Sequence, residues 1–227
     1  MRPWYRFCRV LCQLGFVLLF RGRVFGARNV PRRGPVVLAC NHQSFLDPVL
    51  ATVAVPRECH FMARDTLFRS PRFRRLIEAL NAFPVRRGSA DLAAVKETLR
   101  RLRAGAVVTA FPEATRTPDG ALQPMRGGVL LMARKAGAPL VPTLIFGAFE
   151  AWPRGARLPR PAPILVAYGE PIWPDQLEGL PETAAADLLR QRLEGLLRRY
   201  GGLLPRRARP PRPPPGTRAM EPAAAID

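Results

Sequence analysis

Residues 41–47 contain the side chains of this chain that are best suited to chemistry. His42, one of only two histidines, precedes Asp47 by five residues in the run Asn-His-Gln-Ser-Phe-Leu-Asp. An aspartate that holds an imidazole fixes its tautomer and stabilises the imidazolium, which makes the histidine a general base. Side chains five residues apart meet only where the backbone turns, and Ser44 is a suitable turn residue and helix N-cap. On these residues alone, a capped loop histidine is the simpler alternative.

A second charged cluster follows another strand-like run. Residues 106–110 are apolar apart from Thr109, and Phe-Pro-Glu-Ala-Thr-Arg-Thr follows at residues 111–117, just as the apolar residues 35–40 precede His42. Both clusters therefore stand at predicted strand ends, where open α/β sheets place their sites. Two shorter blocks accompany them: Phe-Pro-Val-Arg-Arg-Gly at 83–88 and Pro-Leu-Val-Pro-Thr at 139–143.

With these four ordered blocks, between about residues 29 and 147, the chain resembles the lysophosphatidate acyltransferase family, the phospholipid/glycerol acyltransferases. The family's blocks have the form NHxSxxD, a short apolar run ending in arginine, FPEGTRS, and a Val-Pro block. One departure is Ala114, where the family has glycine. If that position needs a positive φ or a close approach of the backbone to substrate, alanine would be strained or would crowd the ligand.

The resemblance implies direct transfer of a fatty acyl group from a thioester to an alcohol, without an acyl-enzyme. His42 would take the proton of the acceptor hydroxyl, and Asp47 would orient the imidazole. Ser44 lies near this base but lacks the G-x-S-x-G context of a nucleophile, so we assign it to capping the following helix.

The family's phosphate-binding arginines fall on Arg87 and Arg116, and Arg86 becomes the candidate if the register slips by one. A guanidinium suits a phosphomonoester because its fork donates two hydrogen bonds at once. Thr115 belongs to the same block. Glu113 matches the acceptor-site glutamate, which would either hold Arg116 or contact the glycerol hydroxyl.

Further along, Arg126 and Gly127 resemble the family's basic-plus-glycine element, a weaker phosphate or pantetheine contact. The other histidine, His60, stands in an apolar strand-like run without an acid partner, which favours a core residue. No metal-ligand pattern is visible, so we expect no cofactor beyond the acyl donor, either acyl-CoA or acyl-carrier protein. Cys40 and Cys59 also fall in apolar runs, which favours buried free thiols in a reducing compartment.

The net charge of +19 is nearly all arginine, since Lys96 and Lys135 are the only lysines. Arginine-rich codon usage accounts for about half of this bias in our interpretation. The remaining surface charge would attract anionic lipid head groups, an acidic carrier protein or nucleic acid. Nucleic acid is not the expected partner, because the chain has no zinc-ligand spacing, RNP-type strand or recognition helix.

The N-terminal segment has a polar stripe and an apolar side at helical spacing. Arg2, Arg6, Arg9 and Gln13 form the stripe; the residues opposite are Trp4, Phe7, Leu11, Leu14 and Leu18. The apolar stretch is shorter than the roughly 20 residues that a spanning helix needs. A signal peptide is disfavoured because arginines follow Phe20 without a cleavage pattern. The pattern favours a helix in the membrane interface; a helix packed on the protein's own core is the alternative.

Strand and helix patterns alternate after this segment, which predicts an α/β fold with a mainly parallel central sheet covered by helices. The resemblance makes it glycerol-3-phosphate acyltransferase-like. Strands are predicted at 35–40, 59–62, 82–85, 106–110, 140–146 and 164–168; helices are predicted from 47, at 67–80, 91–103 and 128–136, and around 189–200. The predicted domains are a membrane-associated segment at 1–28, an acyltransferase domain at 29–203 and a disordered Pro/Arg-rich tail at 204–227.

The expected function is acylation of the free sn-2 hydroxyl of 1-acyl-sn-glycerol 3-phosphate to give phosphatidate in phospholipid biosynthesis. The expected location is the cytoplasmic face of the membrane, as a peripheral or monotopic protein on an anionic surface. One alternative changes the acceptor to another lysolipid, such as a lyso-ornithine lipid. A second alternative, from another class, is a basic non-catalytic protein that binds membranes or nucleic acid.

Overall fold

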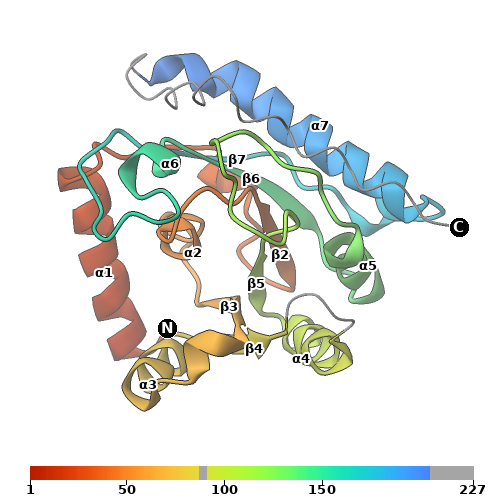
Figure 1. Ribbon diagram of the computed structural model, residues 1–227. Coiled ribbons are helices and arrows are strands. Elements are labelled where there is room, and N and C mark those ends of the chain that lie inside the picture. The colour runs from red at the N-terminus through yellow and green to blue at the C-terminus, as the bar shows by residue number, and fades with distance from the viewer. Residues whose placement is uncertain (87–90, 205–227) are drawn as a thin grey trace, which may run out of the picture.

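A seven-stranded sheet separates two layers of helices (Figure 1). The computed structural model describes residues 1–86 and 91–204. In spatial order, the strands are β1 (Arg23–Phe25), β7 (Leu165–Tyr168), β6 (Leu140–Phe146), β2 (Val36–Cys40), β5 (Val107–Ala110), β3 (Cys59–Arg64) and β4 (Ala82–Val85). All neighbouring pairs are parallel except β6 and β7, which are antiparallel. The predicted mainly parallel sheet is confirmed.

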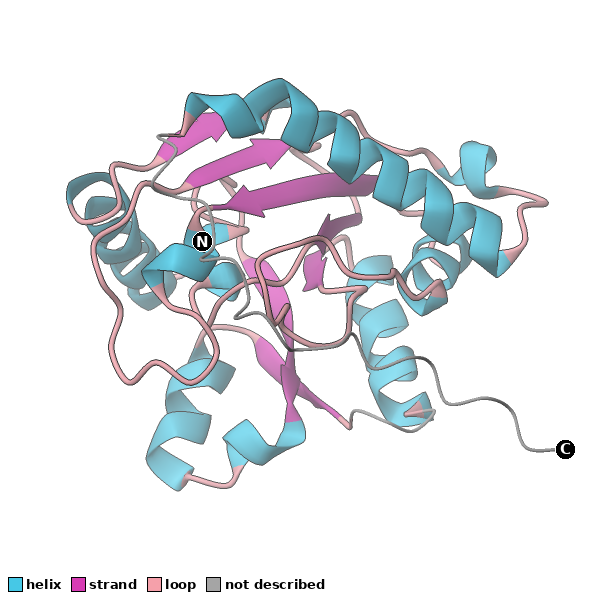
Figure 2. Ribbon diagram, turned by 45° about the horizontal axis from the view of Figure 1, so that its top comes forward, coloured by secondary structure: helices cyan, strands magenta, loops and turns pink. Residues whose placement is uncertain are grey.

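Helices cover both faces of this sheet, and Figure 2 shows the longest of them lying across the strands. They are α1 (Pro3–Leu18), α2 (Asp47–Leu50), α3 (Pro71–Ala79), α4 (Leu92–Arg103), α5 (Gly128–Lys135), α6 (Ala148–Ala151) and α7 (Glu182–Tyr200). Each predicted helix corresponds to one of these elements. The short helix α6 was not predicted.

Strand β2 shows how the two layers are built, because its five residues are all buried and alternate between the faces. Val36, Leu38 and Cys40 pack in one apolar cluster with Phe16 and Phe20 from the N-terminal segment. Val37 and Ala39 pack in the second cluster; its helical members include Leu102 of α4, Leu130 of α5, and Leu189 and Leu193 of α7. The predicted buried positions of Cys40 and Cys59 are confirmed, and both thiols are free.

Several short elements complete the comparison with the sequence-based prediction. Strand β1 lies inside the segment 1–28, where no strand was predicted, and it extends the sheet by pairing with β7. Helix α2 begins at Asp47, where a helix was predicted to begin, and contains only four residues. The helix predicted at 67–80 is divided: a 3-10 helix covers Asp65–Phe68, and Pro71 begins α3.

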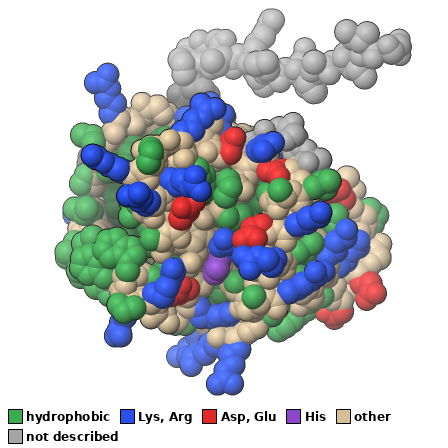
Figure 3. Space-filling view, turned by 90° about the horizontal axis from the view of Figure 1, so that it is seen from below, with side chains coloured by type: hydrophobic (Ala, Val, Ile, Leu, Met, Phe, Trp, Pro, Cys, Tyr) green, Lys and Arg blue, Asp and Glu red, His purple; other side chains and the backbone are tan. Residues whose placement is uncertain are grey.

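Helix α1 turns its apolar side to the solvent, the reverse of a usual surface helix. Its exposed side chains, between 46 and 74 % accessible, are Trp4, Phe7, Val10, Leu11, Leu14, Val17 and Leu18. The polar stripe contacts the protein at its two ends: Arg2 pairs with Glu58 at 3.1 Å, and Gln13 Nε2 donates to the carbonyl of Val53 at 2.7 Å, while Arg6 is exposed. Figure 3 shows hydrophobic side chains gathered at the edge where α1 lies. Among the residues described, no helix is both long and apolar enough to cross a membrane.

Candidate active site

The two charged clusters meet because β2 and β5 are parallel neighbours. Leu38 pairs with Thr109 and Ala39 pairs with Ala110, so both strands end at the same edge of the sheet. The loop after β2 carries His42, and the loop after β5 carries residues 111–117. The predicted place of both clusters at strand ends is confirmed, and the carboxyl edge of a parallel sheet is where α/β proteins place their sites.

His42 and Asp47 form a buried pair in the turn between β2 and α2. His42 Nδ1 lies 2.7 Å from Asp47 Oδ2, and the Asp47 side chain is completely buried. The same oxygen accepts the backbone N–H groups of Gln43 at 2.5 Å and Ser44 at 2.6 Å. Burial raises the pKa of the Asp47 carboxyl, and the bonds from His42, Ser44 and Gln43 oppose that rise. A carboxylate at Nδ1 selects the tautomer protonated there, which leaves Nε2 as the basic nitrogen.

Ser44 does not cap the helix, contrary to the prediction. The N-cap position of α2 is Leu46, and Ser44 Oγ instead accepts the N–H of Leu46 at 3.2 Å and donates to the carbonyl of Trp152 at 2.8 Å. The Asp47 carboxylate itself takes the backbone N–H groups that open the turn, so no serine cap is required. Ser44 therefore ties this turn to the loop after α6.

Glu113 joins the two loops rather than extending into open space. It is 5 % exposed; Oε2 accepts the N–H of His42 at 3.2 Å, and Oε1 accepts the N–H of Gln123 at 3.3 Å. Burial, the largest influence, raises the pKa of Glu113 to about 8. The backbone N–H of Thr117 also donates to the carbonyl of His42 at 2.8 Å. Both peptide groups of His42 are thus held by the loop after β5, a positioning role that the sequence analysis did not consider.

Arg116 is half-buried beside the same turn, with its guanidinium carbon 3.5 Å from the centroid of the Phe45 ring. Thr115 is exposed in this loop. Arg87, the other predicted phosphate-binding arginine, lies outside the described residues. Arg86 is exposed at the carboxyl end of β4, and its backbone N–H donates to Asp91 at 2.8 Å.

Arg126 and Gly127 precede α5 and differ in their surroundings. Arg126 is exposed, and its backbone N–H donates to the carbonyl of Pro112 at 3.0 Å. Gly127 is buried, and a Cβ placed there would stand 1.9 Å from Cγ of Glu182 in α7. The absence of a side chain at Gly127 is therefore explained by helix packing, while substrate contact by either residue stays a prediction.

Ala114 has a φ of +58°, in the left-handed region that glycine adopts without strain. Strain at Ala114 was expected if this position needed a positive φ, and the structure shows that it does. The turn that carries Glu113 and Arg116 therefore contains a strained alanine.

Two further residues support the base but were not among the predicted site residues. Asn41 is 1 % exposed, and its side-chain amide pairs with the backbone of Ile145 in β6, at 2.7 Å to the N–H and 2.8 Å to the carbonyl. The ring of Phe111 stacks on His42, with centroids 4.2 Å apart and an interplanar angle of 25°. Their positions next to the ends of β2 and β5 were visible in the sequence, but the contacts depend on strand pairing.

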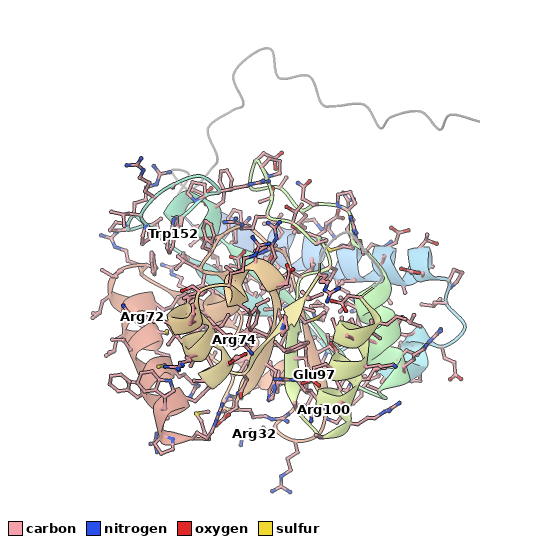
Figure 4. The ribbon with its side chains drawn as sticks, turned by 60° about the horizontal axis from the view of Figure 1, so that its bottom comes forward. Arg32, Arg72, Arg74, Glu97, Arg100 and Trp152 are labelled. Atoms are coloured by element: carbon pink, nitrogen blue, oxygen red, sulfur yellow. The ribbon has the colours of Figure 1, made fainter. Side chains whose placement is uncertain are left out.

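His60 of β3 takes no part in this cluster. Its Nδ1 lies 2.6 Å from Nη1 of Arg101 in α4, and burial followed by the charge of Arg101 lowers the pKa of His60 to about 4. His60 is half-buried rather than fully in the core. Arg101 also pairs with Glu97, the residue that Figure 4 labels beside Arg100 on the same helix. The predicted structural character of His60 agrees with these contacts.

Comparison with known proteins gives matches over most of the chain. Residues 21–146 match the family described as Acyltransferase. A 1-acyl-sn-glycerol-3-phosphate acyltransferase of Bacillus subtilis (strain 168) is 28 % identical over 199 residues, which cover 85 % of this chain and 96 % of that protein. One from Cocos nucifera is 31 % identical over 145 residues, or 63 % of this chain and 47 % of that protein.

A solved structure has the same fold. The crystal structure of the 1-acyl-sn-glycerophosphate (LPA) acyltransferase from Thermotoga maritima superposes with a TM-score of 0.75. The sequences are 24 % identical, and the match covers 87 % of this chain and 79 % of that chain. This chain therefore shares its α/β architecture with a protein whose structure was determined by crystallography.

Proposed function

The chain belongs to the acyltransferase family, and on that premise we propose that it transfers a fatty acyl group from an acyl thioester to 1-acyl-sn-glycerol 3-phosphate. The free sn-2 hydroxyl is the acceptor and phosphatidate is the product. The observation that carries this proposal is the buried His42–Asp47 bond at a sheet edge that also holds Arg116. The relatives from Bacillus subtilis and Cocos nucifera are 1-acyl-sn-glycerol-3-phosphate acyltransferases, which supports this acceptor.

The base acts directly on the acceptor in this mechanism. Nε2 of His42 takes the hydroxyl proton as that oxygen attacks the thioester carbonyl, and Asp47 stabilises the imidazolium that forms. Collapse of the tetrahedral intermediate breaks the C–S bond, and the imidazolium returns the proton to the leaving thiolate. No protein nucleophile is needed, because the thioester is already an activated acyl group.

Arg116 binds the phosphate of the acceptor in this proposal, together with Arg87. Each charge-assisted hydrogen bond contributes about 1.5–3 kcal/mol, so Arg116→Ala should lower kcat/KM on lysophosphatidate by about ten- to a hundredfold. The loss should be much smaller on a lysolipid without a phosphomonoester, which is the control acceptor. Equal losses on both acceptors would assign Arg116 to the donor or to the fold.

A panel of lysolipid acceptors, each assayed with acyl-CoA and with acyl-carrier protein, tests the substrate assignment. The expected outcome is highest kcat/KM on lysophosphatidate and loss of transfer in His42→Ala. A preference for a lyso-ornithine lipid would replace the acceptor but keep the chemistry. No thioester-dependent transfer on any acceptor would favour the non-catalytic alternative.

We also propose that the apolar side of α1 lies in the interface of an anionic membrane, on its cytoplasmic face. The support is the outward position of Phe7, Leu11 and Leu14, each at least 52 % exposed, together with a net charge of +19. Deleting the helix would be a poor test, because Phe16 and Phe20 belong to the apolar core. The point substitutions Phe7→Glu, Leu11→Glu and Leu14→Glu together leave that core intact.

The combined α1 variant should lose sedimentation with vesicles that contain anionic lipid, and wild-type binding should weaken as salt rises. Leu92→Glu is the matched control, since Leu92 is 69 % exposed on α4. Full vesicle binding by the α1 variant would reject this surface as the membrane contact.

A further inference from the structure

Phe45 stands between the base and its aspartate in the sequence, yet its ring lies against a residue of a different loop. It is 50 % exposed, and the guanidinium carbon of Arg116 is 3.5 Å from the ring centroid. At that distance the guanidinium must lie flat on the ring, because an edge-on approach would force a nitrogen inside van der Waals contact. A flat stack uses the face of the guanidinium and not its N–H donors, which lie in its plane.

The Phe45 ring also contacts a second aromatic ring. The ring of Trp152 lies 5.4 Å away at an interplanar angle of 47°. Trp152 follows α6 (Figure 4), and its Nε1 donates to the carbonyl of Ala156 at 2.9 Å. Its own carbonyl accepts the hydroxyl of Ser44 at 2.8 Å, so the residue before Phe45 is anchored to the same tryptophan. This support fixes the ring although half of its surface faces solvent.

We propose that Phe45 is a positioning residue, whose ring sets the distance between the phosphate-binding guanidinium of Arg116 and the base His42. This rests on the proposed function. The sn-2 hydroxyl and the sn-3 phosphate of the acceptor are carried on adjacent carbons. The ligand therefore tolerates little variation in the distance between Arg116, which binds the phosphate, and His42, which deprotonates the hydroxyl. One turn that presents both the imidazole and the platform for the arginine keeps that spacing constant.

Phe45→Leu tests the proposal, because leucine keeps the apolar bulk and removes the aromatic face. The variant should lower kcat/KM on lysophosphatidate by about three- to tenfold, mainly through a higher KM, while Phe45→Tyr keeps near wild-type values. Phe73→Leu on α3 is the matched control, since Phe73 is 42 % exposed and lies outside the site. Thermal unfolding of each variant establishes that the fold is retained.

A double-mutant cycle separates positioning from other roles. In an Arg116→Ala background, Phe45→Leu should have no further effect on kcat/KM. An equal loss in both backgrounds would overturn the proposal, because the ring would then act on the acyl chain or the fold. A wild-type KM for Phe45→Leu, with the Arg116→Ala loss intact, would overturn it and leave the proposed function standing. Full activity of Arg116→Ala would instead reject the phosphate assignment, and the positioning role with it.

Discussion

Replacing Asp47 by asparagine removes a charge while keeping the shape of the turn. The amide oxygen can occupy the position of Oδ2, which accepts three N–H groups, from His42, Gln43 and Ser44. The NH2 group would then stand at Oδ1, which accepts no hydrogen bond from the described residues. A buried amide left unsatisfied costs about 1–3 kcal/mol, so Asp47→Asn should be less stable by about that free energy of unfolding but still folded.

The effect on catalysis should be larger than the effect on stability. With His42 Nδ1 and Asp47 Oδ2 at 2.7 Å, the charge centres of imidazolium and carboxylate are roughly 4 Å apart. At an effective dielectric constant of about 20, they attract by about 4 kcal/mol. Because the imidazolium forms only as the hydroxyl is deprotonated, this attraction stabilises the transition state. Its loss should lower kcat by about 10³-fold.

Thiol release from the acyl donor, measured at saturating lysophosphatidate on vesicles, gives the required kcat. Asp187→Asn is the matched control, because Asp187 is exposed on α7. The double variant His42→Ala/Asp47→Asn should be no slower than His42→Ala, since the two residues act as one unit. A folded Asp47→Asn protein with kcat within about threefold of wild type would refute the assignment of Asp47 to the base.

Three other changes test the framework of the site. Because burial raises the pKa of Glu113 to about 8, the folded state holds a proton that the unfolded chain releases near pH 4.5. The free energy of unfolding should therefore fall as pH rises from about 4.5 to about 8, and Glu113→Gln should flatten that slope in denaturant titrations. Ala114→Gly should raise the melting temperature through relief of about 1 kcal/mol of left-handed strain, and a clear fall would contradict this. Asn41→Ala should cost about 2–5 kcal/mol of unfolding free energy, because two buried backbone groups of Ile145 lose their partners, and near-wild-type stability would contradict it.

The sequence was sufficient to place the base but not its supports. Strand-like runs at 35–40 and 106–110, which end shortly before His42 and Glu113, predicted two strand ends, and parallel pairing brings such ends to one edge. The hydrogen bond from the His42 N–H to Glu113 and the stacking of Arg116 on Phe45 could not be predicted, because they join residues distant in sequence. Which rings and carboxylates meet there depends on how the two loops pack.

Short elements were missed for a different reason. Strand β1 has three residues beside several arginines, too few for an alternating pattern to be detected. Its pairing with β7 is set by the surrounding fold rather than by local preference. The serine cap failed as a prediction because Asp47 satisfies the turn with its own carboxylate, which propensity at a single position does not reveal.

Because the apolar side of α1 faces outward, the free energy of unfolding of this protein should depend on what covers that side. A lipid, a detergent or a second copy that covers this face and binds the folded chain more tightly than the unfolded one stabilises the fold. Linkage then raises the free energy of unfolding by RT ln(1 + [L]/Kd), where [L] is the concentration of the covering phase. Melting temperatures from plain buffer will therefore differ from those in detergent and will depend on protein concentration. Comparisons between variants require the same amphiphile at the same concentration.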